Sequence, residues 1–528
     1  MRITNKIMQN NNLTNINNNK IMQDKLSTMM STGKKINKPS DDPVIAIRAL
    51  RLRSNVTEVT QYFGKNIPDA ESWLDVTEGA LKNNAQILTN MIGQCTKGAN
   101  GDLTSKDREI ILEQLKALRD EIYSTANVDY AGRFVFAGYR TDTSIGFLAA
   151  DDTKYTITEQ LDNSAIDSMT FIKTTAQLAN GDVVDINDIN QTNYADIDVA
   201  EADVDKVEVH RIRLAYNNLS DGMVPTITRV TGKDAAGNIT TEDVVNPVNV
   251  CHSYDVPTAY ELASQNPDEV YFIPETGEMV LGENVYSKMM TYKDSATTAT
   301  ANEGEIRITY QKNEWQKGDL RPEHYYSCTA EDKDGNTIDY NEDYLKGTDY
   351  KKQVIEYDVG FNQTIRINTT ADECFEPGVG REVDDLINVL GEVQGLEEVT
   401  EKLASLLENE TDDTKRTTLQ LRLKAANKAL SYAKDKMQRM FEGGITAMQG
   451  YLDANNLALT NCGTRSSKLE LIENRMRDQK TTFETLQSEN EDIDITDVII
   501  NMKSAELTYS AALMATGKVA QTNLLNFI

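Results

Sequence analysis

The segment DITDVIINMKSAELTYSAALMATGKVAQTNLLNFI (Asp494–Ile528) carries its apolar residues three or four positions apart. This spacing places them along one side of a helix. The opposite end of the sequence has a thinner stripe of the same period and eight Asn among its first twenty residues. Because Asn is a mediocre helix former, we expect residues 1–40 and 495–528 to be disordered or frayed in the free subunit and to fold only on assembly, when other subunits cover their apolar stripes.

Helical spacing continues inward from both ends. Apolar residues from Val59 to Ile92 keep to three- and four-residue steps, which predicts a long amphipathic helix with a kink at Pro68. Thr104 and Asp107 have the spacing of a capping box and predict the start of a second helix. After Pro377 the remaining 151 residues contain no proline, and helical spacing returns. Helices that flank a large insertion must bury their stripes against one another, so both ends should form one antiparallel bundle.

The stretch from 147 to 377 has a different composition. It holds seven of the ten prolines and several runs that alternate apolar and polar residues, such as Ile306-Ile308-Tyr310. The expected fold class is mainly α with inserted β: an antiparallel long-helix bundle built from both chain ends, with one or two β-rich domains inserted in the middle. We divide the chain into a terminal coiled-coil assembly domain (1–40 and 495–528), a helical bundle domain (41–146 and 378–494) and a surface-exposed insert (147–377). We expect the insert to be removable without loss of the bundle.

Charge and composition argue against nucleic acid, a membrane span and a disulfide scaffold. The formal charge of -29 disfavours nucleic acid, because phosphate binding needs clustered Lys and Arg. No run approaches the ~18 consecutive apolar residues of a membrane span, and the first residues lack the apolar core of a cleaved secretory signal. The five cysteines are odd in number, scattered and without a CxxC pair, so we expect neither a disulfide framework nor a zinc knuckle.

The sequence offers few residues for catalysis. His210, His252 and His324 lack the HExxH spacing, and there is neither a Gly-rich phosphate loop nor a nucleophile elbow. We therefore expect no enzymatic activity, no catalytic residue, no metal and no cofactor.

Two features of the insert each leave two interpretations open. The acidic run from Asp182 to Glu208 alternates charges with Val and Ile, which fits a strand with one solvated face or weak calcium binding. Trp315, Tyr325 and Tyr326 fit either core packing or a sugar-binding platform.

Two motifs resemble the flagellin superfamily. MSTGKKINKPSDDP (Met30–Pro43) is similar to the N-terminal motif of that family, and GRFVFAGYRTDT (Gly132–Thr143), which predicts a strand and a turn, is similar to another of its segments. The helix predicted from Ile495 to Ile528 is similar to the terminal helix of the family. The resemblance covers about residues 1–146 and 380–528 and leaves the middle uncovered. Judged by its residues alone, SDDP also fits an ordinary helix N-cap.

The resemblance implies a structural component of the extracellular bacterial flagellum, an adaptor at the junction of hook and filament that polymerises through its terminal helices. The implied partners are further copies of itself in a ring-like homo-oligomer, hook-associated protein 1, flagellin and a flagellar export chaperone, with secretion through the flagellar channel and no cleaved signal. Two alternatives stay open: flagellin itself, and a flagellar scaffold whose insert is an adhesin or glycan-binding module. Together, the apolar stripes and the first motif place subunit contacts at Ile3, Ile7, Gly33, Asn37, Pro39, Ser40, Asp41, Asp42, Pro43, Met502, Leu513, Leu524, Leu525 and Phe527.

Overall fold

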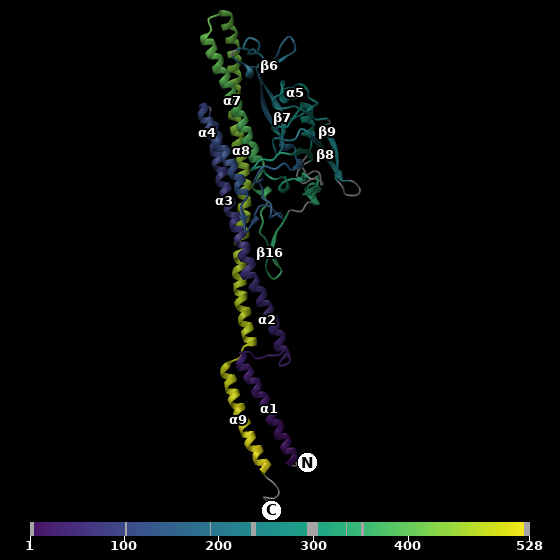
Figure 1. Ribbon diagram of the computed structural model, residues 1–528, viewed down its shortest axis with the longest axis vertical. Coiled ribbons are helices and arrows are strands. Elements are labelled where there is room, and N and C mark those ends of the chain that lie inside the picture. The colour runs from purple at the N-terminus through teal and green to yellow at the C-terminus, as the bar shows by residue number, and fades with distance from the viewer. Residues whose placement is uncertain are drawn as a thin grey trace, which may run out of the picture. The chain divides into compact units, whose positions relative to one another are not determined.

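The computed structural model describes residues 5–100, 103–190, 192–233, 239–245, 247–292, 305–333, 335–349 and 353–521. The chain forms two compact units. Unit 1 comprises Met1–Glu71, Tyr357–Ile365 and Ser467–Ile528, and unit 2 comprises Ser72–Glu356 and Arg366–Ser466. Long helices come from both ends of the sequence and β-rich structure lies between them, so the predicted fold class is confirmed (Figure 1).

In unit 1 the two terminal helices pack on each other. Helices α1 (Asn5–Thr32) and α9 (Ile495–Gln521) lie side by side and antiparallel (Figure 1). A small core joins the end of α1 to the start of α9, with Leu26, Val498 and Ala505 buried and Met29, Ile493 and Met502 packed against them. In this part of the helices, apolar side chains that we expected only another subunit to cover pack against the other end of the same chain.

Unit 1 also contains other elements. Helix α2 (Pro43–Gln61) follows the loop of residues 33–42. The last turns of α8 (Asp413–Glu491) and the hairpin of β16 (Glu356–Gly360) and β17 (Gln363–Arg366) also belong to this unit.

A π-helical turn, Tyr62–Asn66, separates α2 from α3 (Ile67–Gly98). Its cause is local, because Pro68 has no N–H to donate to the carbonyl of Gly64, four residues earlier. A wider turn is one way in which a helix accommodates such a missing bond. The sequence predicts a kink at Pro68, and this turn lies just before it. The ring of Tyr62 lies edge-on to Phe361 of the β16–β17 hairpin, with the centroids 5.8 Å apart.

The helices of unit 2 are α3 from Ser72 onward, α4 (Ser105–Ala126), α7 (Gly378–Asn409) and α8 up to Ser466. The predicted capping box at the start of α4 is confirmed: the side chain of Thr104 accepts from the backbone N–H of Asp107, and the carboxylate of Asp107 accepts from that of Thr104. Between α3 and α8, the side-chain amide of buried Asn84 donates to that of buried Asn455 at 3.0 Å. Such a buried polar pair fixes the register of the two helices.

The β-rich insert contains two main sheets. The six-stranded sheet has the order β15-β14-β3-β13-β8-β9 and is antiparallel throughout. The five-stranded sheet has the order β10-β11-β12-β7-β4, with β10 and β11 parallel. The strands of the two sheets are β3 (Lys154–Leu161), β4 (Ile166–Lys173), β7 (Asp205–Arg213), β8 (Thr226–Lys233), β9 (Ile239–Val245), β10 (Asn249–Val250), β11 (Val270–Ile273), β12 (Glu278–Leu281), β13 (Ile306–Lys312), β14 (Ser327–Glu331) and β15 (Thr337–Tyr340).

The insert also contains smaller elements. They are the hairpin of β5 (Thr175–Gln177) and β6 (Val183–Asp185) and the helices α5 (Ala259–Gln265) and α6 (Glu283–Met289). The alternation predicted at Ile306, Ile308 and Tyr310 is confirmed, because all three side chains of β13 are buried.

The motif Gly132–Thr143 forms less strand than its residues predict. Only β1 (Asp129–Tyr130) and β2 (Arg133–Phe134) pair, across a turn in which Ala131 and Gly132 have φ of 52° and 77°. Two consecutive residues at positive φ are typical of a tight hairpin turn. The next three residues, 135–137, are buried without joining a strand.

Buried ion pairs attach the insert to the helices of unit 2. Arg211 of β7 donates to Asp385 of α7 through Nη2, 2.5 Å from Oδ2, and also contacts Glu278 of β12. Arg213 donates to the same carboxylate at 2.9 Å and to Glu382 at 2.6 Å. The side chains of Arg211 and Asp385 are only 6% and 7% exposed, so the insert and α7 share a desolvated interface.

Candidate assembly surface

The first motif forms a loop that is tied to the junction of α8 and α9. Gly33 ends α1 with φ of 69°, a conformation that favours glycine, and its N–H donates to the carbonyl of Met29 at 2.8 Å. The backbone N–H of Lys35 then donates to the carbonyl of Glu491 at 2.7 Å, and that of Ile493 to the carbonyl of Gly33 at 3.1 Å. The loop therefore holds the start of α9 against the end of α1.

The two aspartates of the motif cap backbone groups inside the same loop. The carboxylate of Asp41 accepts from the N–H groups of Lys38 and Asn37, at 2.9 and 3.1 Å, and these bonds lower the pKa of Asp41. Asp42 accepts from the N–H groups at positions 44 and 45, and Pro43 occupies the first turn of α2, so the ordinary N-cap interpretation of SDDP is confirmed.

Both carboxylates thus have an internal role. Pro39, Ser40, Asp41 and Pro43 remain exposed, and Asp42 is half-buried. Their expected contact with another subunit stays a prediction.

A buried carboxylate anchors this junction. The side chain of Glu491 is 2% exposed, and Arg53 of α2 donates to both of its oxygens, at 2.7 and 2.6 Å. Lys34 lies 3.4 Å from Glu491 and 2.6 Å from Asp492. The hydrogen bonds from Arg53 lower the pKa of Glu491. Sequence analysis missed Arg53, Lys34 and Glu491 as site residues.

The terminal helices leave much apolar surface uncovered. Met502 packs on the small core, whereas Ile7 and Leu513 are 48% and 46% exposed. Ile3, Leu524, Leu525 and Phe527 lie outside the described residues. The other exposed large apolar side chains of these helices are Met8, Leu13, Ile21, Met22 and Met30 on α1, and Ile495, Ile499, Ile500, Leu507 and Met514 on α9. This pair of helices therefore presents an apolar surface far larger than its own core.

Helix α2 adds to the exposed apolar surface of unit 1. Val44, Ile47 and Leu50 follow one another at three-residue steps and are all more than half exposed. Residues at this spacing lie on nearly the same side of a helix. Arg48 and Arg51 are exposed on the same helix.

The alternatives left open for the insert are resolved in part. Trp315 and Tyr325 are 2% and 8% exposed, and the ring of Trp315 stacks on Phe147 with the centroids 4.9 Å apart. Core packing is therefore confirmed for these two aromatics, and the sugar-binding platform expected as an alternative is wrong.

The histidines and cysteines also have local roles. His210 stacks on Tyr286, His252 pairs with Glu275, and His324 is buried. The five cysteines are buried thiols. Within the described ranges, no group of three or more His, Cys, Asp or Glu side chains is placed to hold a metal ion. None of the described helices combines the length and apolar character that a membrane span requires.

Comparison with known proteins gives matches to parts of the chain. Residues 3–141 match the family model described as the bacterial flagellin N-terminal helical region. Over 146 residues the chain is 31% identical to flagellar hook-associated protein 3 of Salmonella typhimurium, a match that covers 27% of this chain and 45% of the relative. Flagellin of Bacillus subtilis is 24% identical over 215 residues, 39% of this chain and 70% of that protein.

The chain thus spans a little under half of the hook-associated relative that it matches. Among solved structures, flagellar hook-associated protein 3 of Legionella pneumophila is 10% identical, with a TM-score of 0.28 over 83% of this chain and 98% of that chain.

Proposed function

We propose that this chain is a member of the flagellin superfamily and is the subunit that joins the hook to the filament of a bacterial flagellum. In this proposal it is exported through the flagellar channel with a dedicated chaperone. It then assembles into a ring-like homo-oligomer between hook-associated protein 1 and flagellin. The similarity of 146 of its residues to hook-associated protein 3 supports the junction role over that of a filament subunit.

The exposed apolar surface of α1 and α9 carries this proposal. Six large apolar side chains on each helix are at least 40% exposed. A monomer that keeps such a surface in water forgoes about 1.5–3 kcal/mol for each Leu, Ile or Met that a neighbour could bury completely. Large exposed apolar patches mark interaction sites, and these side chains are spread along both helices. Pairing with equivalent helices of neighbouring subunits would bury both stripes, since the period of the stripes is that of helix packing.

Immunogold labelling of isolated flagella tests the location. The junction role predicts label at one point, between hook and filament, and a trace band on gels of sheared flagella. Label along the whole filament and a dominant band would instead identify a filament subunit.

Deletion of the gene tests the role itself. We expect hooks without filaments and flagellin released into the medium, with restoration by the intact gene. Normal filaments on the deletion strain would reject the junction role.

A further inference from the structure

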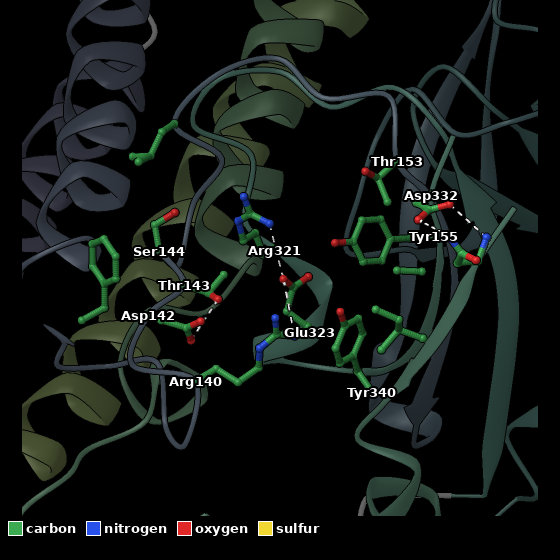
Figure 2. Close-up of a pocket in the computed structure, with 15 residues that line it drawn as sticks. Arg140, Asp142, Thr143, Ser144, Thr153, Tyr155, Arg321, Glu323, Asp332 and Tyr340 are labelled. Carbon is green, nitrogen blue, oxygen red and sulfur yellow. Dashed lines mark hydrogen bonds and ion pairs between the residues drawn. The ribbon is translucent and has the colours of Figure 1, made fainter. Parts of the chain in front are cut away.

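A pocket of about 490 Å³ lies in unit 2, where the motif Gly132–Thr143 meets the six-stranded sheet (Figure 2). Its walls come from the loop that follows β2, from the 3₁₀ turn Pro322–His324 and from strands β3, β14 and β15. This volume is within the range of roughly 300–1,000 Å³ that small-molecule sites occupy. None of the lining residues belongs to the terminal helices.

A buried carboxylate forms the polar centre of the pocket. The side chain of Glu323 is 2% exposed and lies between two guanidinium groups, as Figure 2 shows. Nη1 of Arg321 donates to Oε1 of Glu323 at 3.4 Å. Nη1 of Arg140 is 3.8 Å from the same oxygen, beyond hydrogen-bond distance. The guanidinium groups of Arg321 and Arg140 therefore both lie near Oε1 of Glu323.

Three buried polar atoms of this group have no hydrogen-bond partner in the described part of the chain. They are Oε2 of Glu323, Nη1 of Arg140 and Nε of Arg321. Buried polar atoms in folded proteins are nearly always paired. An acceptor and two donors thus lie without partners on three residues that line the pocket.

Aromatic rings hold both guanidinium groups in place. The guanidinium carbon of Arg140 lies 4.4 Å from the centroid of Tyr340, and that of Arg321 lies 4.2 Å from the centroid of Phe147. These cation–π contacts fix the donors before any ligand arrives. Such preorganisation lowers the entropic cost of binding.

The charges of the pocket are nearly balanced. Two guanidinium groups face the carboxylates of Glu323, Asp142 and Asp332. Burial lowers the pKa of neighbouring His324 to about 4, so that imidazole is neutral near pH 7. A strongly charged ligand would meet charges of its own sign here. A hydroxyl fits better, because it donates to a carboxylate and accepts from a guanidinium with the same oxygen.

The remaining walls suit the C–H surfaces of a sugar ring. Phe134, Tyr155 and Tyr340 line the pocket, and Leu148 and Ile338 stand at its rim, 62% and 55% exposed. We propose that this pocket binds a neutral saccharide with vicinal hydroxyls. In this proposal, Glu323 accepts from one hydroxyl, and Arg140 and Arg321 donate to the hydroxyl beside it.

The test uses the full chain and free saccharides: mannose, galactose, N-acetylglucosamine, lactose and maltose, with N-acetylneuraminic acid and glucose 6-phosphate as charged comparisons. Saturation-transfer difference NMR identifies a binder, and isothermal titration calorimetry gives its affinity. We expect at least one neutral sugar to bind. Glu323→Gln should weaken that binding about tenfold or more, because the substitution removes a charged acceptor.

Two further variants guard against a folding defect. Ile338→Lys puts a longer, charged side chain at the exposed rim without touching the core, and we expect the same loss of binding. Glu331→Gln is the matched control, because Glu331 lies on the same strand as the pocket residue Ala330 but outside the pocket, paired with Lys154 at 3.1 Å. Its binding should equal that of the unmodified chain.

Each contrary result overturns the proposal. It is rejected if no neutral sugar binds, if only the charged sugars bind, or if binding survives both Glu323→Gln and Ile338→Lys. These results leave the junction role untouched, because that role depends on the terminal helices.

Discussion

Replacing Asp385 with Asn tests whether the insert and the helices of unit 2 unfold as one. The carboxylate accepts from Arg211 at 2.5 Å and from Arg213 at 2.9 Å, and it is 7% exposed. Removing one partner from a buried ion pair costs about 3–5 kcal/mol. Arg211 retains Glu278, and Arg213 retains Glu382 and Asp167, so we expect about 3 kcal/mol, the lower end of that range.

The two tryptophans make the assay specific. Trp73 is buried in α3 and Trp315 is buried in the insert. The Trp73→Phe protein keeps Trp315, so its fluorescence in urea follows unfolding of the insert. The Trp315→Phe protein keeps Trp73, so its fluorescence follows unfolding of the helices. If the buried ion pairs couple the two parts, Asp385→Asn shifts both transitions to lower urea by the same amount.

A matched substitution separates burial from charge. Asp435 of α8 pairs with Lys206 of β7 at 3.0 Å, and this ion pair also joins helix to insert, but Asp435 is 58% exposed. Because exposed ion pairs contribute little, Asp435→Asn should cost less than about 1 kcal/mol. Equal losses from both substitutions, or a shift of the Trp315 transition alone after Asp385→Asn, would refute the coupling.

Three other predictions concern protonation, assembly and local opening. Burial lowers the pKa of His324 to about 4, whereas the same imidazole in the unfolded chain binds a proton near pH 6.5. The free energy of unfolding should therefore keep its full value above pH 6.5 and fall by about 3 kcal/mol as the pH drops to 4. In urea titrations, His324→Gln should lack this pH-dependent loss. An equal slope in that variant would contradict the assignment. Leu507 is 72% exposed, and Leu507→Glu should abolish assembly in sedimentation and release flagellin from cells. The control Thr508→Glu, one position away, should assemble normally. Normal assembly of Leu507→Glu would exclude the face of α9 that carries Leu507 as a subunit contact. Hydrogen exchange of the monomer should be faster in α1 and α9 than in α8, because only a small core joins the terminal helices, and uniform protection would disprove the difference.

The parts of the fold predictable from sequence are those whose cause is local. The capping box needs only Thr104 and Asp107, three residues apart, and the interruption before α3 needs only the missing N–H of Pro68. Strand β13 follows from alternation at Ile306, Ile308 and Tyr310. In each case the deciding interaction lies within one turn or one strand.

The hairpin at β1 and β2 shows where local patterns mislead. The run of branched and aromatic residues after Gly132 favours a longer strand. In the structure, Phe136 turns inward and packs edge-on to Phe375 with the centroids 4.9 Å apart. A burial site more than two hundred residues away overrides the strand propensity, and no pattern within the motif encodes that partner.

Ionic contacts were the least predictable part of the candidate site. Arg53 and Glu491 are 438 positions apart, and neither stands out among the many charged residues of its helix. The same holds for Arg211 and Asp385, which bind the insert to α7. Removal of residues 147–377 without loss of the bundle stays a prediction, and the buried ion pairs show that such a deletion would uncover the face of α7 around Asp385.

Glu491 explains how the terminal helices could change partners while the rest of unit 1 stays folded. Its buried carboxylate is held by Arg53 of α2 and lies 3.4 Å from Lys34 of the loop after α1. Three chain segments are thus fixed at the point from which α1 and α9 extend. Beyond that point the helices share only a small core, with most of their large apolar side chains exposed. Separating α1 from α9 would therefore cost little burial, and pairing with neighbouring copies would gain more. A fixed junction beside a small intramolecular core is consistent with the proposed assembly through the terminal helices.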